Sequence, residues 1–322
     1  MDRGNGPERL VAGVDVGGTK VAVLIVDDHD NVCSRLTVPT ILNGPESTLA
    51  GIVAAVQEAV GRAGADISDV AAVGVGVPGR VDTETGVVRS AVNLGWREMP
   101  VGEAISARLG VPCFLENDVR MAAIGVQRYM GSSANRNIAY VSIGTGIAAG
   151  MILDGHIYRG AHGLAGEIGH MIINRDGKRC PCGARGCLET VAAGPAIAAL
   201  GAEAAASGTP TILRDYGPVT TEAVYSAARD GDAAAQEITR SVGCYLALAL
   251  QQLIVAYDME CIVLGGGVSR AGEAFLQPIL SELAHLRENS ALTTEMIQPD
   301  MIRLLPPNYE AGPWGGVMLA RG

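Results

Sequence analysis

The sequence predicts a protein of two α/β domains, and three observations indicate this fold class. The chain has 322 residues, and one domain per roughly 150 residues is a reasonable expectation. Apolar residues make up 48% of the chain, which is enough for a sizeable core in each domain. A first group of valine- and isoleucine-rich extended runs begins near residue 10, and a second group begins near residue 137. Because the second opening follows the order of the first, an internal duplication is favoured.

The first strand-rich segment contains three extended runs, LVAGVDVGG, TKVAVLIVDD and VCSRLTVPT, separated by Gly, Asp and Asn residues that favour turns. An amphipathic helix follows, because apolar residues recur at helical spacing: Leu49, Ile52, Val53, Val56 and Val60. The run VAAVGVGVPG predicts a strand, and the residues from there to about Pro100 show no regular pattern. A short helix near 101–109 and the strand VPCFL are expected next.

The second strand-rich segment consists of NIAYVSIGTG followed by IAAGMILDG. Further along, residues 232–257 contain YLALALQQLIVAY, which predicts a long helix buried on most sides, and the strand CIVLGGG follows. We expect a smaller domain of residues 1–118 plus 308–322 and a larger domain of residues 119–307, with a cleft between them.

The charge balance argues against two classes of partner. The chain has 34 acidic and 24 basic residues, a formal net charge of −10. Binding to nucleic acid or to an anionic membrane needs a basic face, so neither partner is expected. No apolar segment typical of a signal peptide occurs near the start, and no uninterrupted apolar run reaches about 18 residues. We therefore expect a soluble, cytoplasmic protein.

A glycine-rich turn follows the first predicted strand, in the segment Asp15-Val16-Gly17-Gly18-Thr19-Lys20. Its backbone N–H groups and threonine hydroxyl can approach phosphate oxygens closely. Asp15 is placed to hold a magnesium ion through water, and Lys20 adds positive charge. An ordinary hairpin turn explains the segment equally well. The spacing of a P-loop is absent, and no GxGxxG opens a helix here.

Two further turns repeat this chemistry after predicted strands: Gly144-Thr145-Gly146 and Gly265-Gly266-Gly267. One such turn in each domain can hold a triphosphate from both sides, and the third suits an adenosine face or its α-phosphate. Each is also explained as a simple turn. Their joint placement after strands favours the phosphate interpretation.

The segment Glu116-Asn117-Asp118 follows the strand VPCFL and precedes a helical pattern over 119–130. Ligands of α/β sheets bind at the carboxyl ends of strands, so a carboxylate here is well placed to act as a general base. Asn and Asp are also favoured helix N-caps, and from position alone the cap is the stronger interpretation.

A glycine-rich loop, CPCGARGC, carries three cysteines, and a histidine precedes it: Cys180, Cys182, Cys187 and His170. Three thiolates and one imidazole form a closed tetrahedral zinc site with no position for a catalytic water, so we expect structural zinc. A disulfide is disfavoured in a reducing compartment. The zinc loop, residues 170–187, would also fix the nearby carboxylates of Glu167 and Glu189.

Together these motifs resemble the sugar kinases of the ROK family (repressors, open reading frames and kinases), within the actin–hexokinase–Hsp70 superfamily. The matching segments run in family order: DVGGTK (15–20), GVPG (76–79), NLGW (93–96), END (116–118), SIGTGIAAG (142–150), GEIGH (166–170), CPCGARGCLE (180–189) and LGGG (264–267). The pair GEIGH and CxCGxxGCxE is highly specific. The resemblance implies a two-domain actin/hexokinase-like (ribonuclease-H-like) α/β fold with an interdomain cleft and a zinc-binding loop.

The resemblance also implies roles for individual residues. Asp118 would be the general base that takes the proton from the sugar hydroxyl attacking the γ-phosphate. Contacts to the sugar would come from Gly79, Asn93, Asn117, Asp118, Glu167, His170 and Glu189. ATP and Mg²⁺ would be surrounded by Asp15, Gly17, Gly18, Thr19, Lys20, Gly144, Thr145, Gly146, Gly265 and Gly266. His170 would bind the sugar with one ring nitrogen and structural Zn²⁺ with the other, and the family makes a homodimer or homotetramer the expected assembly.

The expected function is ATP-dependent phosphorylation of a hexose, with glucose to glucose 6-phosphate as the first choice, since NLGW and the GEIGH…CLE set resemble the glucokinases of the family. Kinases of N-acetylmannosamine, N-acetylglucosamine and fructose share most of these residues and stay as alternatives. A sugar-responsive repressor is disfavoured, because only 14 residues precede Asp15, too few for a helix-turn-helix domain. A polyphosphate-dependent kinase and a sugar-binding protein without catalysis are also disfavoured.

Three features stay unexplained or only partly explained. Arg120 follows the END segment where the family often has Ala-Asn, and its cation would tune the base or face solvent. Pro313 and Trp314 stand where small residues are usual. Glycine makes up 43 of the 322 residues, against roughly 7% in ordinary chains. We expect this surplus to serve mostly the ligand-binding and metal loops.

Overall fold

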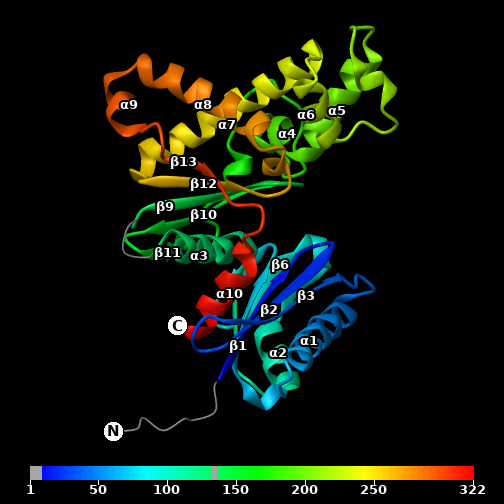
Figure 1. Ribbon diagram of the computed structural model, residues 1–322, viewed down its shortest axis with the longest axis vertical. Helices are drawn as coiled ribbons and strands as arrows, with labels where there is room; N and C mark the ends of the chain where they lie inside the picture. The colour runs from blue at the N-terminus through cyan, green and yellow to red at the C-terminus, as the bar shows by residue number, and fades with distance from the viewer. Residues whose placement is uncertain (1–8, 132–135) are drawn as a thin grey trace. The chain divides into compact units, whose positions relative to one another are not determined.

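The computed structural model describes residues 9–131 and 136–322, which form two compact units (Figure 1). Among these residues, the first unit comprises 9–131, 156–165 and 310–322, and the second comprises 136–155 and 166–309. The boundaries differ from the expected ones, in which the first domain ends at residue 118. The helix that begins there stays with the first unit because it packs against the C-terminal helix of the same unit.

The first unit is built on a five-stranded sheet in the order β3-β2-β1-β4-β8. The strands are β1 (Leu10–Val16), β2 (Lys20–Val26), β3 (Val32–Pro39), β4 (Val70–Val77) and β8 (Cys113–Asn117). β1 and β2 are antiparallel, whereas β1, β4 and β8 run parallel. Asp15 is paired with Gly76, and Gly76 with Glu116. The register therefore brings the first glycine-rich turn and the END segment to the same edge of the sheet.

Helices cover both faces of this sheet. Helices α1 (Pro45–Arg62) and α2 (Val101–Leu109) share one core with alternate residues of β1, and the short helix η1 (Ile67–Asp69) precedes β4. The two helices were expected at these places from apolar spacing, and they are confirmed. On the other face lies α10 (Ala311–Arg321), the red helix beside blue β1 in Figure 1, packed against α3 (Asp118–Met130).

Helix α10 packs so closely against the sheet and against α3 that the contacting positions must be glycine. A Cβ on Gly13 would lie 1.9 Å from the carbonyl oxygen of Pro313, and one on Gly125 would lie 2.0 Å from that of Ala311. Trp314 is buried against the guanidinium of Arg128, which stands 3.6 Å from its ring centre. Part of the glycine surplus thus serves helix packing, and this interface accounts for Trp314. Pro313 sits in the first turn of α10, where a missing N–H costs nothing.

The segment from 80 to 100, irregular in the sequence analysis, is in fact a small antiparallel sheet in the order β5-β6-β7. Its strands are β5 (Arg80–Asp82), β6 (Val87–Ala91) and β7 (Trp96–Met99), with the short helix η2 (Val92–Leu94) between the last two. Runs of three to five residues are too short to display an alternating pattern. A further short strand, β11 (His156–Tyr158), belongs to the first unit.

Within the second unit, four sheet strands follow one another in the order β10-β9-β12-β13. Its strands are β9 (Ile138–Ile143), β10 (Ile147–Leu153), β12 (Cys261–Gly265) and β13 (Ile302–Leu304). β9 is antiparallel to β10 and parallel to β12, as β1 is to β2 and β4. The two units thus share the strand pairing that the repeated sequence order indicated.

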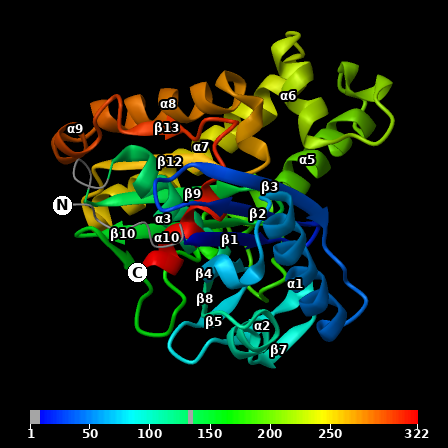
Figure 2. The same cartoon turned by 60° about the horizontal axis from the view of Figure 1, so that its bottom comes forward.

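Helices of the second unit include one long apolar helix, α7 (Ala233–Tyr257), which starts at the N-cap Asp232 as expected. Figures 1 and 2 both show α8 beside α7, and the two are packed together. Among the described residues α7 is long and apolar enough to span a membrane, yet 56% of its most apolar window is buried, as in the core helix of a soluble protein. The other helices are α4 (Glu189–Ala192), α5 (Gly194–Ala206), α6 (Thr221–Arg229), α8 (Glu273–Glu288), α9 (Ala291–Met296), η3 (Ile168–His170), η4 (Ile212–Asp215) and η5 (Val268–Ala271).

Candidate active site

The first glycine-rich segment forms a tight turn between β1 and β2. The Gly17 N–H donates to the Lys20 carbonyl at 2.8 Å, and the exposed Thr19 lies at the tip. A Cβ on Gly18 would lie 3.6 Å from Cβ of Asn93, so Asn93 is next to this turn. The structure therefore brings together the turn predicted to bind phosphate and a residue predicted to bind sugar.

Asp15, at the end of β1, has an unusual ionisation. Burial raises the pKa of its carboxyl to about 7, with a further rise from the negative charge of Asp118 and an opposing effect from Lys20. The two carboxyl groups are therefore close enough to interact. Mg²⁺ prefers oxygen ligands such as carboxylates, so a bound cation would relieve the cost of ionising Asp15.

The END segment acts as a helix cap and holds Asp118 at the same time. The side-chain oxygen of Asn117 accepts the N–H groups of Val119 and Arg120, both at 3.1 Å. Its amide nitrogen donates to Oδ1 of Asp118 at 3.0 Å and to the carbonyl of Gly79 at 3.1 Å. The cap and general-base interpretations are thus compatible, and Gly79 joins the same cluster.

Gly79 has a conformation that only glycine accepts easily. Its φ is +93°, and a Cβ there would lie 2.1 Å from the carbonyl oxygen of Ser90. The loop between β4 and β5 can therefore present its backbone beside Asn117 without an intervening side chain.

In the second unit, Glu189 lies directly against the turn Gly144–Gly146. Oε2 of Glu189 accepts the N–H of Ile147 at 3.1 Å, and a Cβ on Gly146 would lie 2.6 Å from that oxygen. Gly265 is paired with Ser142 in the sheet, which puts the third glycine-rich turn, with Gly266 at φ +89°, beside the second. Residues predicted to bind nucleotide thus lie together with one predicted to bind sugar.

A cavity of about 370 Å³ opens beside these turns within the second unit. Its wall contains Gly144, Thr145 and Gly267, which belong to the predicted glycine-rich turns, and it also contains residues outside those motifs: Gly194, Pro195, Ala198, Val219, Thr220, Thr221, Glu222 and Val268. Thr220 is the N-cap of α6 and Pro195 lies in the first turn of α5, so the local signals these two residues carry in the sequence are helix starts and not ligand binding. The cavity has the size and mainly apolar lining suited to a flat base.

The four predicted metal ligands come together. Their ligand atoms all lie within 4.8 Å of one another, with Cys180 Sγ 3.7 Å from His170 Nδ1 and Cys182 Sγ 3.7 Å from Cys187 Sγ. A tetrahedron of zinc–sulfur bonds of about 2.3 Å has edges of roughly this length. The donor set and its spacing therefore fit a closed zinc site.

The GEIGH segment rests on the backbone of β10. A Cβ on Gly166 would lie 1.8 Å from the carbonyl of Ala149, and one on Gly169 would lie 2.3 Å from that of Ile147. Glu167 and His170 are both exposed. Because Nδ1 of His170 faces the thiols, its Nε2 is left for another partner. The predicted site residues thus form two groups, one in each unit.

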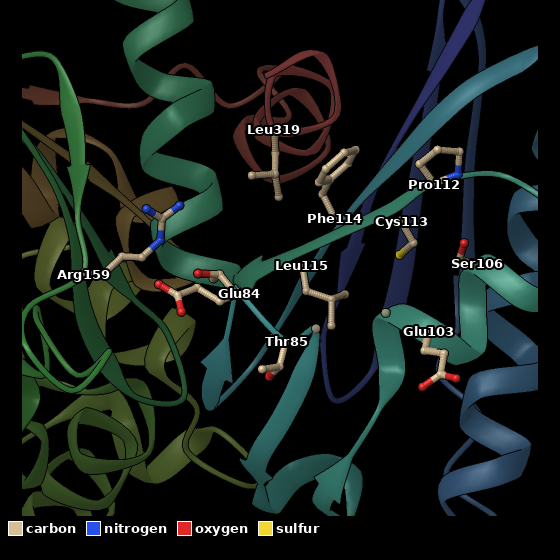
Figure 3. Close-up of a pocket in the computed structure, with 13 residues that line it drawn as sticks. Glu84, Thr85, Glu103, Ser106, Pro112, Cys113, Phe114, Leu115, Arg159 and Leu319 are labelled. Carbon is tan, nitrogen blue, oxygen red and sulfur yellow. The ribbon is translucent and has the colours of Figure 1, made fainter.

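A larger cavity, about 710 Å³, lies within the first unit and contains none of the predicted site residues (Figure 3). Its wall is formed by residues 83–86, part of α2, residues 112–115, Arg159 and Leu319. Strand β8 thus borders this cavity and carries the END segment at its carboxyl end.

Comparison with known proteins agrees with this arrangement. The model of the ROK family matches residues 11–305. The chain is 35% identical to a glucokinase of Streptomyces coelicolor over 278 residues, 84% of this chain and 86% of that protein. It is 34% identical to an N-acetylmannosamine kinase of Yersinia pestis over 262 residues, 80% of this chain and 83% of that protein.

A solved structure is similar over nearly the whole chain. It is a ROK family glucokinase from Streptomyces griseus in complex with glucose and AMPPNP, with a TM-score of 0.78 and 32% identity. The match covers 97% of this chain and 99% of that one. By sequence motifs, by fold and by these comparisons, the chain belongs to the ROK family.

Proposed function

We propose that the protein is an ATP-dependent hexose kinase that converts glucose to glucose 6-phosphate. The observation that carries the proposal is the placement of Asp118 at the carboxyl end of β8, where Asn117 holds its carboxylate. The identity to a glucokinase and the likeness to a glucose-bound ROK glucokinase support glucose as the sugar.

In the proposed reaction, Asp118 takes the proton of the sugar hydroxyl as that oxygen attacks the γ-phosphate. Phosphoryl transfer asks mainly for alignment of the two reactants and for stabilisation of charge. The Asn117 amide fixes the direction of the carboxylate, while Asn93 and the Gly79 backbone bind the sugar from the same unit.

The second unit supplies the remaining groups in this proposal. Glu167, His170 and Glu189 bind further sugar hydroxyls, and the turns at 144–146 and 265–266 bind ATP. His170 and the three cysteines would hold Zn²⁺, which would fix the direction of the imidazole in a structural role. Mg²⁺ would be held near Asp15 through water and would neutralise charge on the phosphates.

We further propose a soluble, cytoplasmic homodimer or homotetramer that acts on a small sugar and not on nucleic acid or membranes. The acidic net charge of −10 supports this choice of partners. A gel shift with genomic DNA tests the repressor alternative, which sequence-specific binding would revive.

The main alternative is a kinase of an N-acetylhexosamine, which the identity to an N-acetylmannosamine kinase favours. Release of ADP should be measured with glucose, mannose, fructose, N-acetylmannosamine and N-acetylglucosamine. We expect the highest kcat/KM with glucose. A higher value for an N-acetylhexosamine would change the substrate, and no ADP release with any hexose would refute the kinase proposal.

A further inference from the structure

Arg120, the residue that departs from the family pattern, does not face solvent. Its side chain is 3% exposed, and it lies against Glu116, whose side chain is 0% exposed. A buried charge needs a partner, because transfer from water to the protein interior is unfavourable for an isolated ion. Arg120, in the first turn of α3, and Glu116, in the END segment, are each other's partner.

Glu116 is held by two arginines, and we call these three residues the Glu116 clamp: Glu116, Arg120 and Arg159. Oε1 of Glu116 accepts Nε of Arg120 at 2.8 Å, and Oε2 accepts Nε of Arg159 at 2.7 Å. Arg159 is 38% exposed and lies on the wall of the 710 Å³ cavity (Figure 3). Both carboxylate oxygens are therefore fixed from different directions.

The clamp is joined to the proposed base by consecutive hydrogen bonds. Oε1 of Glu116 also accepts the backbone N–H of Asn117 at 2.8 Å. The Asn117 amide in turn donates to Asp118 Oδ1 at 3.0 Å and to the Gly79 carbonyl at 3.1 Å. Movement of Glu116 would therefore displace the residue that orients Asp118.

Arg120 makes a second contact while it holds Glu116, which requires the several N–H donors of a guanidinium group. Its NH1 group donates to the carbonyl of Gly163 at 3.0 Å while Nε holds Glu116. Arg159 comes from the same segment, 156–165, as Gly163, so this segment is tied to the END segment through Glu116 and to the start of α3 through Arg120. The remaining NH2 group of Arg120 is buried without a hydrogen-bond partner. Burial of an unpaired donor is unfavourable, which argues that stability alone does not explain this residue.

We propose that Arg120 and Arg159 are positioning residues that act through Glu116 to keep Asn117 and Asp118 aligned for phosphoryl transfer. This inference rests on the proposed kinase function. Neither arginine needs to touch the sugar or ATP in this role. The expected effect of losing the clamp is a lower kcat with little change in sugar affinity, because small misplacements of reacting groups slow transfer strongly.

The test uses the double variant Glu116→Gln/Arg120→Met in the full chain. Removing both charges avoids leaving one buried ion, and neutral replacement of a buried pair is often tolerated by the fold. The matched control is Glu58→Gln/Arg62→Met, which removes an exposed Glu–Arg pair of the same i,i+4 spacing. Steady-state kinetics give kcat and KM, calorimetry gives the Kd for the sugar, and thermal unfolding reports on folding.

We expect kcat of the clamp variant to fall at least about tenfold, with a sugar Kd within about threefold of the original, and no change in the control. Arg120→Lys keeps the charge but cannot reach both acceptors, so its kcat should stay at least about threefold below the original. If the double variant folds and its kcat equals that of the unsubstituted protein, the proposal is overturned. Full activity of Arg120→Lys would overturn the two-point contact as its basis.

Hydrogen exchange tests the clamp without turnover. The backbone N–H of Asn117 should exchange at least about tenfold faster in the double variant, since its acceptor becomes a neutral amide without the contact from Arg120. Amides in the middle of α7, which neither variant touches, should be unchanged in both. A protein that phosphorylates no hexose would refute the proposed function, whereas unchanged Asn117 exchange would overturn the clamp by itself.

Discussion

Replacement of Asp15 by Asn should stabilise the protein at alkaline pH while removing its activity. Burial, assisted by the charge of Asp118, raises the pKa of Asp15 from 3.8 to about 7 in the folded protein. Ionisation of this carboxyl therefore costs more free energy in the folded protein than in the unfolded chain. Asparagine has nearly the same shape and carries no charge, so it escapes this cost.

The size of the effect follows from the shift. A rise of about three pKa units, at 1.36 kcal/mol per unit, corresponds to about 4 kcal/mol at most. Between the ordinary pKa and the raised one, the folded state binds more protons than the unfolded state. The stability contributed by protonated Asp15 is therefore present below about pH 4 and is lost as the pH rises to 7.

The assay is denaturant unfolding at pH 4.5 and pH 8 without added Mg²⁺ or nucleotide. The gain from Asp15→Asn should be small at the lower pH and reach a few kcal/mol at the higher one. Asp27→Asn is a control with the opposite sign, because hydrogen bonds from Asn31 lower the pKa of Asp27. If Asp15→Asn is no more stable than the original at pH 8, the reasoning about burial is refuted.

Three further predictions test separate parts of the molecule. Asp118→Asn should lower kcat by about 10²- to 10⁴-fold with nearly unchanged sugar affinity, and an equal loss of binding would make Asp118 a contact residue instead. Metal analysis should find one zinc per chain, and Cys187→Ser should lower both zinc content and sugar affinity; freshly purified protein without zinc would contradict the metal assignment. Gly125→Ala, whose Cβ would lie 2.0 Å from a carbonyl of α10, should destabilise by at least about 2 kcal/mol. Gly61→Ala, which meets open space in α1, should gain up to about 1 kcal/mol, and equal effects of the two would refute the packing argument.

Much of the fold and of the site follows from local patterns. The apolar spacing of Leu49 to Val60 predicts α1, and the apolar run after residue 232 predicts α7, both of which are confirmed. The spacing of the three cysteines predicts a metal site, and the structure brings them together with His170. These features can be read from sequence because residues within a few positions of one another determine them.

Other features depend on contacts that no local pattern contains. The sequence by itself determined the strands β1 to β4, β8 to β10 and β12, the glycine-rich turns and the END segment, since each has a local composition or motif. Only the tertiary structure decided that Gly13 and Gly125 serve the docking of α10, that residues 80–100 pair as a sheet, and that Arg120 is buried on Glu116. Gly13 and Pro313, for example, are about 300 positions apart in the chain but in contact in the fold. A glycine that permits close packing, or an arginine that is buried on a carboxylate, is recognised only when such neighbours are known.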